Sequence, residues 1–112
     1  GIYSARLAKK YGSFFKAMKY ILKRMRNKKN RQATFVCRLS FRRENKRIVT
    51  VEGRLNGIIS NKILGKKGFG YDPIFIPKGK KITFGQMQKS KKIKIDHRYL
   101  AFKKLKKKVR TL

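Results

Sequence analysis

The sequence predicts an α/β fold in which a mixed, largely antiparallel central sheet is flanked by helices. Three observations lead to this class: an amphipathic helical pattern near the start, alternating apolar segments in the middle, and a second helical pattern at the end. A chain of 112 residues forms one domain at most, and a globule of this size buries roughly 65% of its unfolded surface. The apolar share of 40%, with 8 Phe and 5 Tyr, is too high for a disordered basic tail. We therefore expect the chain to fold.

Residues 13–26 have the apolar spacing of an amphipathic helix. Ser13 stands at the N-cap position of this helix. Basic residues near its C-terminus interact favourably with the negative end of the helix dipole. The apolar positions are Phe14, Phe15, Met18, Ile21, Leu22 and Met25.

The segment ATFVCRLSF, residues 33–41, alternates in the manner of a half-buried strand. One face of this strand carries Ala33, Phe35, Cys37, Leu39 and Phe41. Residues 42–45, with the sequence RREN, are expected to form a turn.

A second strand is indicated by the apolar residues Ile48, Val49 and Val51. Residues 55–60 form either a third strand or a continuation of the second, bent at Gly53 or Gly57. Neighbouring strands joined by short turns pair in antiparallel fashion. These segments therefore supply most of the sheet.

A glycine-rich section follows, with Gly65, Gly68 and Gly70 allowing positive φ or a close backbone approach. Pro73 and Pro77 bracket the apolar run IFI at residues 74–76. Such a short apolar run between turn residues predicts a buried strand.

The last third of the chain predicts two helices. Thr83 can cap a short helix that runs through Met87, and Asp96 can cap the final helix. In the final helix, inward positions are expected at Tyr99, Phe102, Leu105 and Val109 or their neighbours. The lysine-rich run at 89–94 is expected to be a solvated face.

The charge is strongly asymmetric. Against 4 Asp and Glu stand 34 Lys and Arg, which gives a net charge of +30. Such a field attracts polyanions, so nucleic acid, nucleotide phosphates and anionic membrane surfaces are the partners to weigh. No stretch approaches the 18 apolar residues of a membrane span. A basic protein that binds nucleic acid without specificity is one functional alternative.

The single cysteine, Cys37, excludes an internal disulfide, and no Cys/His cluster is present to hold zinc. A reducing cytoplasm is the expected location. Because the chain begins with Gly1 and not Met, we expect further residues to precede it.

Each candidate site feature has a structural alternative. The Gly65, Gly68, Gly70 spacing is not a phosphate-binding loop of the Walker type, because no GK[ST] follows. Asp72 before Pro73 can be a turn residue. His97 beside Asp96 can be a capping or surface residue.

The features gain meaning in combination. They are GIYSAR at 1–6, Gly-x3-Gly at 53–57, GFGYDPIFIP at 68–77, Thr83, and Lys92 five residues before His97-Arg98. This set, which runs along nearly the whole chain, resembles the Ham1 family of inosine and xanthosine triphosphate pyrophosphatases. The resemblance implies the Ham1 fold and hydrolysis of deaminated purine nucleoside triphosphates (dITP/ITP and XTP) to the monophosphate and pyrophosphate. It also implies a magnesium cofactor and a homodimer.

The resemblance also maps the purine-binding residues of the family onto this chain. These positions are Phe69, Gly70, Tyr71, Asp72, Lys92, His97 and Arg98.

The chemistry of these residue types agrees with the implied substrate. A deaminated purine carries a 6-oxo acceptor and a protonated N1, whereas adenine carries an amino donor and an unprotonated N1. Arg98 or Lys92 can only donate, and an ionised Asp72 can only accept. A mismatch with adenine would leave both partners unpaired, which can discriminate by roughly 10⁴. Phe69 or Tyr71 could stack on the ring.

The chain is poor in the carboxylates that magnesium requires. Besides Asp72 it has Glu44 in a predicted turn, Glu52 in a predicted strand and Asp96 at a helix cap, and these form no pair. The resemblance implies that the metal-binding and catalytic acids lie upstream of GIYSAR. We therefore expect residues 1–112 to be the C-terminal portion of a single pyrophosphatase domain, without catalytic or metal-binding residues and inactive alone. A nonfunctional remnant is the third alternative.

Overall fold

The computed structural model describes residues 2–42, 44 and 46–110. Its helices and strands are α1 (Ile2–Tyr11), α2 (Phe14–Met25), β1 (Gln32–Phe41), β2 (Val49–Ile59), β3 (Phe75–Pro77), α3 (Lys89–Lys92) and α4 (His97–Arg110), with 3-10 turns η1 (Asp72–Ile74) and η2 (Phe84–Gln86). The strands form one sheet in the order β1-β2-β3, and both pairs are antiparallel. The predicted α/β class with a largely antiparallel sheet and flanking helices is confirmed. Among the described residues, no helix is long and apolar enough to cross a membrane.

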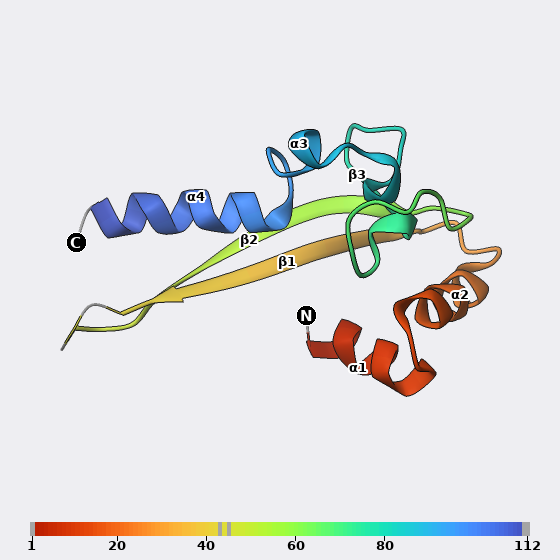
Figure 1. Cartoon of the computed structure of the whole chain (residues 1–112), viewed down its shortest axis with the longest axis horizontal. Helices are drawn as coiled ribbons and strands as arrows, with labels where there is room; N and C mark the ends of the chain where they lie inside the picture. Colours follow the sequence, from red (N-terminus) through yellow and green to blue (C-terminus); the bar gives the residue numbers. More distant parts are fainter. Residues whose placement is uncertain (1, 43, 45, 111–112) are drawn as a thin grey trace.

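The β1–β2 hairpin is the long central element of the structure (Figure 1). Its register runs from Gln32 opposite Ile58 to Phe41 opposite Val49. Residues 49–51 and 55–59 are therefore parts of the single strand β2, so the continuation and not a third strand is correct, and Ile48 and Ser60 lie just outside it. The expected alternation of β1 is confirmed, because its exposed positions alternate with half-buried ones along most of its length. The turn expected at 42–45 includes residues 43 and 45, which lie outside the described residues.

The main core lies where β1, β3 and η2 meet. Phe75, Phe84 and Met87 are buried there, and Ala33, Phe35, Leu55 and Ile95 pack against them. The rings of Phe35 and Phe75 stack with centroids 3.9 Å apart. The strand expected at 74–76 begins one residue later than predicted, since Ile74 closes the turn η1 that starts at Asp72.

Helix α4 lies along the hairpin (Figure 1) and begins as predicted at its Asp96 cap, whose Oδ1 accepts the Tyr99 N–H at 2.8 Å. Of the predicted inward positions, Leu105 and Val109 are half-buried, whereas Tyr99 and Phe102 are 39% and 59% exposed. Their neighbour Ala101 is fully buried instead. A Cβ on Gly53 of β2 would collide with the backbone at Ala101, so the helix approaches the strand too closely for a large side chain between them.

Helix α2 matches the predicted amphipathic helix, and its Ser13 cap accepts the Lys16 N–H at 3.1 Å. Ala17 and Met18 are buried, but Phe14 and Phe15 remain 41% and 55% exposed. The sequence did not predict helix α1, which packs against α2.

The lysine-rich run at 89–94 is not a uniformly solvated face. Residues Lys89–Lys92 form the short helix α3, and the side chain of Lys92 is buried. The predicted short helix after Thr83 is confirmed as η2, and the Thr83 hydroxyl donates to the Leu64 carbonyl at 2.7 Å. This bond fixes the start of the glycine-rich section against the core.

Candidate functional site

The loop between Gly68 and Asp72 folds around one carboxylate. The Oδ2 of Asp72 accepts the backbone N–H of Phe69 at 2.9 Å. Gly68 has φ +73°, and a Cβ at this position would overlap with Asp72 Oδ2. A residue with a side chain would therefore displace the carboxylate, which explains the glycine at this point of the loop.

The same oxygen of Asp72 forms a buried ion pair with Lys92. Lys92 Nζ lies 2.7 Å from Asp72 Oδ2, and the two side chains are 7% and 3% exposed. The pair connects the loop before β3 with helix α3. The prediction that Asp72 is a turn residue is thus correct in part, since its carboxylate accepts a backbone N–H of the loop. The same carboxylate also neutralises the buried ammonium of Lys92.

Two cations contact the ring of Phe69. Lys92 Nζ lies 4.2 Å from the ring centroid and Arg98 Cζ lies 4.0 Å from it. Attraction of a cation to a ring face is worth on the order of 1 kcal/mol. Phe69 as a whole is nevertheless 53% exposed, so the residue remains accessible to a planar ligand.

His97 opens helix α4 and is half-buried. Its ring lies edge-on to that of Phe35, with centroids 5.0 Å apart. Burial lowers the pKa of His97, Arg98 and Lys92 lower it further, and Asp96 and Asp72 oppose the shift. The imidazole is therefore neutral at pH 7, and among the described residues its buried Nδ1 finds no hydrogen-bond partner. His97 is thus neither the cap, which is Asp96, nor a freely solvated surface residue.

Tyr71 stands on the side of the loop that faces helix α2. Its ring meets that of Phe14 edge-on, with centroids 5.1 Å apart. Burial raises the pKa of Tyr71, so the phenol stays neutral at physiological pH.

These side chains line a cavity of about 420 Å³. Six of the seven predicted site residues contribute to it: Phe69, Gly70, Tyr71, Asp72, His97 and Arg98. Lys92 lines an adjoining cavity of about 650 Å³, which shares Phe69 and Arg98 with the first. The structure therefore brings all seven residues to two adjoining cavities, and Lys92 and Arg98 contact the ring of Phe69 directly.

Sequence reasoning missed several residues of this cavity. Ala5 of α1, Phe14 of α2, and Thr34, Phe35 and Val36 of β1 complete its walls. Phe35 and Phe14 could be recognised as apolar positions of a strand and a helix, but their place beside the loop depends on long-range packing that the local pattern does not contain.

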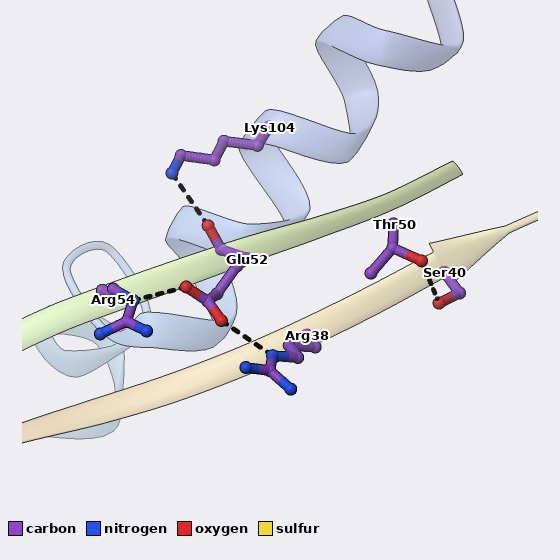
Figure 2. Close-up of polar contacts among 6 residues, drawn as sticks. All are labelled: Arg38, Ser40, Thr50, Glu52, Arg54 and Lys104. Atoms are coloured by element: carbon purple, nitrogen blue, oxygen red, sulfur yellow. Dashed lines mark hydrogen bonds and ion pairs between the residues drawn. The ribbon is translucent and has the colours of Figure 1, made fainter. Parts of the chain in front are cut away.

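Magnesium is the cofactor that the sequence resemblance implies, and the four acidic residues do not fit it. Figure 2 shows Glu52 on the surface of the hairpin, held by Arg38 at 2.8 Å and by Arg54, while Lys104 of α4 donates to its carbonyl at 2.9 Å. Hydrogen bonds from these two arginines lower the pKa of Glu52. Asp72 is paired with Lys92, and Asp96 caps α4. Within residues 2–42, 44 and 46–110, no group of three or more His, Cys, Asp or Glu could hold a metal ion.

The chain is similar to known proteins along nearly its whole length. Residues 1–108 match the Ham1 family. The chain is 42% identical over 108 residues to a protein of Caulobacter vibrioides named dITP/XTP pyrophosphatase, and 41% identical over 110 residues to one of the same name from Dictyoglomus thermophilum. The alignments cover 95% of this chain in both cases, and 56% and 53% of the two relatives. The chain thus spans about half the length of the curated relatives it matches.

Solved structures give the same result. The Ham1 protein of Staphylococcus aureus superposes with a TM-score of 0.91 at 33% sequence identity, covering 99% of this chain and 58% of that one. A dITP/XTP pyrophosphatase from Mycobacterium abscessus superposes with a TM-score of 0.78 at 32% identity, covering 94% and 55%. Fold, motif order and sequence identity agree, and the chain belongs to the Ham1 family.

Proposed function

We propose that this chain forms the purine-base pocket of a pyrophosphatase that hydrolyses deaminated purine nucleoside triphosphates to the monophosphate and pyrophosphate. The observation that carries the proposal is that six of the seven predicted residues line one cavity and Lys92 lines the adjoining one, with Phe69 and Arg98 common to both. The dITP/XTP pyrophosphatase names of the relatives support the same substrate class.

The charges around the ring suit a deaminated base. Arg98 and Lys92 are donors without acceptor capacity, and both lie at the face of Phe69. A base stacked on this ring would have a guanidinium within reach of its 6-oxo group. The amino group of adenine, a donor, would face the same cation without a hydrogen bond, and a mismatch of this kind costs binding energy.

Asp72 has a positioning role in this proposal. Its Oδ2 already accepts from Phe69 and Lys92, so this oxygen fixes the stacking ring and one of the two cations. We further propose that the other carboxylate oxygen of Asp72 accepts a hydrogen bond from the protonated N1 of the base. His97, being neutral, adds no cation that would repel a protonated ring nitrogen.

Hydrolysis also needs a metal site, and magnesium would clamp the phosphate charge when bound. Because the carboxylates of this chain do not fit such a site, we propose that the metal-binding and catalytic acids belong to the part of the relatives that has no counterpart in this chain. The chain alone then binds the base without hydrolysing the anhydride. Assembly as a homodimer in the cytoplasm completes the proposal by family resemblance.

The test is pyrophosphate release from ITP, XTP, GTP and ATP with magnesium. It is made with the chain alone and with a chimera that adds the unmatched part of the Caulobacter vibrioides relative. We expect activity on ITP and XTP in the chimera and none in the chain alone. A chimera that is folded but inactive on every nucleotide, or one equally active on ATP, would contradict the proposal.

A further inference from the structure

A second concave surface lies beside helix α2, separate from the base pocket. It encloses about 980 Å³ and is built from three segments: the end of α1, helix α2 with the residues that follow it, and residues 61–63. Its cationic lining residues are Lys16, Lys19, Lys23, Arg26, Arg31 and Lys62. None of the described residues that line it also lines the base pocket. We call this surface the α2 groove.

Arg31 has a structural role in the groove, and the other five cations line it. The guanidinium of Arg31 donates to the carbonyls of Ile59, Met25 and Ser60 at 2.9, 2.6 and 2.7 Å. It therefore fastens the segment after β2 to the end of α2 and makes a fixed wall. The remaining five cations have exposed side chains, and the described lining contains no Asp or Glu.

Aromatic rings are interleaved with these cations. Tyr11 and Tyr20 stack on each other with centroids 4.7 Å apart. Phe15 is 55% exposed, and Lys19 Nζ lies 5.3 Å from the centroid of its ring. Proteins that bind single strands without sequence preference combine a positively charged groove for the backbone with aromatic rings on which bases stack.

We propose that the α2 groove binds single-stranded nucleic acid, with its five exposed cations at the phosphates and Phe15 as the stacking platform. A strand fits a concave surface, whereas an anionic membrane favours an amphipathic face whose apolar side chains enter the lipid. The lysines of α4 are numerous, but they lie along one helix and are not interleaved with rings in a groove of this size. The groove thus combines charge, shape and stacking in one place.

The first test measures binding of a fluorescent 12-nucleotide oligouridylate to the chain by anisotropy at several salt concentrations. For single strands the slope of log K against log salt is about −0.7 for each phosphate contact, so five contacts predict a slope of about −3.5. Saturating ITP should leave the affinity unchanged, because the base pocket is a different surface. Displacement of the oligonucleotide by ITP would overturn the proposal.

Charge variants separate the groove from the overall charge. The triple variant Lys16→Gln, Lys19→Gln, Lys23→Gln leaves two of the five cations, and the slope should fall to about −1.4. Its matched control changes Lys103, Lys106 and Lys107 of α4 to Gln, which removes the same net charge from exposed helical positions. The control should keep the slope near that of the parent protein. An equal loss in both variants would show that binding follows net charge alone and would overturn the proposal.

Phe15 gives a test that is independent of charge. Phe15→Leu keeps an apolar side chain and removes the ring, and the affinity for the oligonucleotide should fall roughly tenfold, within the range measured for lost base stacking. Circular dichroism checks that the helix is retained. An unchanged affinity in Phe15→Leu would overturn the stacking role. Binding to vesicles of phosphatidylglycerol and phosphatidylcholine that outcompetes the oligonucleotide would identify a membrane surface instead and overturn the proposal as a whole.

Discussion

At the scale of single residues, the pair of Asp72 and Lys92 explains why a chain with few acids places one in the glycine-rich loop. The pair is nearly inaccessible, at 3% and 7% side-chain exposure. An unpaired charge in such a position is costly, because desolvation is no longer offset by attraction. The carboxylate is therefore needed for the fold of the loop, in addition to any contact with a base.

Asp72→Asn tests this account of the loop. The change keeps the shape of the side chain but leaves the Lys92 ammonium buried without a counter-charge. We expect the free energy of unfolding in denaturant to fall by about 3–5 kcal/mol. The double variant Asp72→Asn, Lys92→Met should recover much of this loss, because it removes the isolated charge.

A surface pair gives the control. Glu52 is held by Arg38 and Arg54 at the exposed hairpin surface, and Glu52→Gln should leave the unfolding free energy nearly unchanged, since exposed ion pairs contribute little. Equal effects of Asp72→Asn and Glu52→Gln would contradict the structural role of Asp72.

His97 predicts a pH dependence of stability. Burial lowers its pKa in the folded protein below the ordinary value of 6.5, so the unfolded chain binds a proton more readily. Stability is then highest above pH 6.5 and falls as the pH drops through 6.5 toward the lower folded pKa. Denaturant unfolding between pH 8 and pH 5 should show this loss. His97→Gln, which does not titrate, should flatten the profile in this range, and an identical slope in the variant would assign the effect to other groups.

At the scale of elements, the contact between α4 and β2 positions the site. Gly53 faces Ala101 so closely that an added Cβ would meet the backbone of α4. His97 and Arg98 begin the same helix. The geometry of the proposed base pocket therefore depends on how near the helix lies to the strand.

Gly53→Ala should push α4 away from the sheet. We expect a loss of about 1–3 kcal/mol in unfolding free energy, as for overpacked cores, together with weaker binding of ITP. Gly79→Ala is the control, because its Cβ would meet no atom within 4 Å and only the strain of its φ of +82° is added. Should Gly53→Ala keep full ITP affinity, the proposed link between helix packing and pocket would be wrong.

The elements differ in how far the sequence predicts them. The α2 helix, the alternating β1 strand and the Thr83 and Asp96 caps are local patterns, and the structure confirms them. The burial of Lys92 in α3 was missed, because it depends on contacts with Asp72 and Phe69, which lie far away in the sequence. Helix α1 was also missed, although it packs against its sequence neighbour α2. A long-range contact also explains why Ala101 is buried in α4 and the larger Tyr99 and Phe102 are not: only a small side chain fits opposite Gly53.

In the candidate site, too, the sequence predicts some features and long-range packing determines the others. The seven residues could be placed in one site from motif order and family resemblance, and the structure brings them together. Their mutual arrangement could not be predicted from the sequence. That Asp72 holds Lys92, and that Lys92 and Arg98 both contact Phe69, results from the packing of α3 and α4 against the loop.

At the scale of the whole molecule, the net charge of +30 attracts every nucleoside triphosphate. This field cannot distinguish one base from another, because all triphosphates carry the same charge on the phosphates. In the proposed function, discrimination between bases therefore depends on the pocket around Phe69. Salt screens the general attraction between exposed charges over about 8 Å at physiological ionic strength, so the two contributions can be separated.

The most direct measurement is the equilibrium affinity of the chain for ITP and for ATP in 0.3 M salt with a chelator, where no metal contributes. The two ligands differ at the base and not in the triphosphate. The account predicts that ITP binds at least about tenfold more tightly, within the roughly 10⁴-fold range open to a hydrogen-bonding site, and that Arg98→Met removes this preference. Equal affinities for ITP and ATP in the parent protein would contradict the central claim that this chain carries a pocket for a deaminated purine.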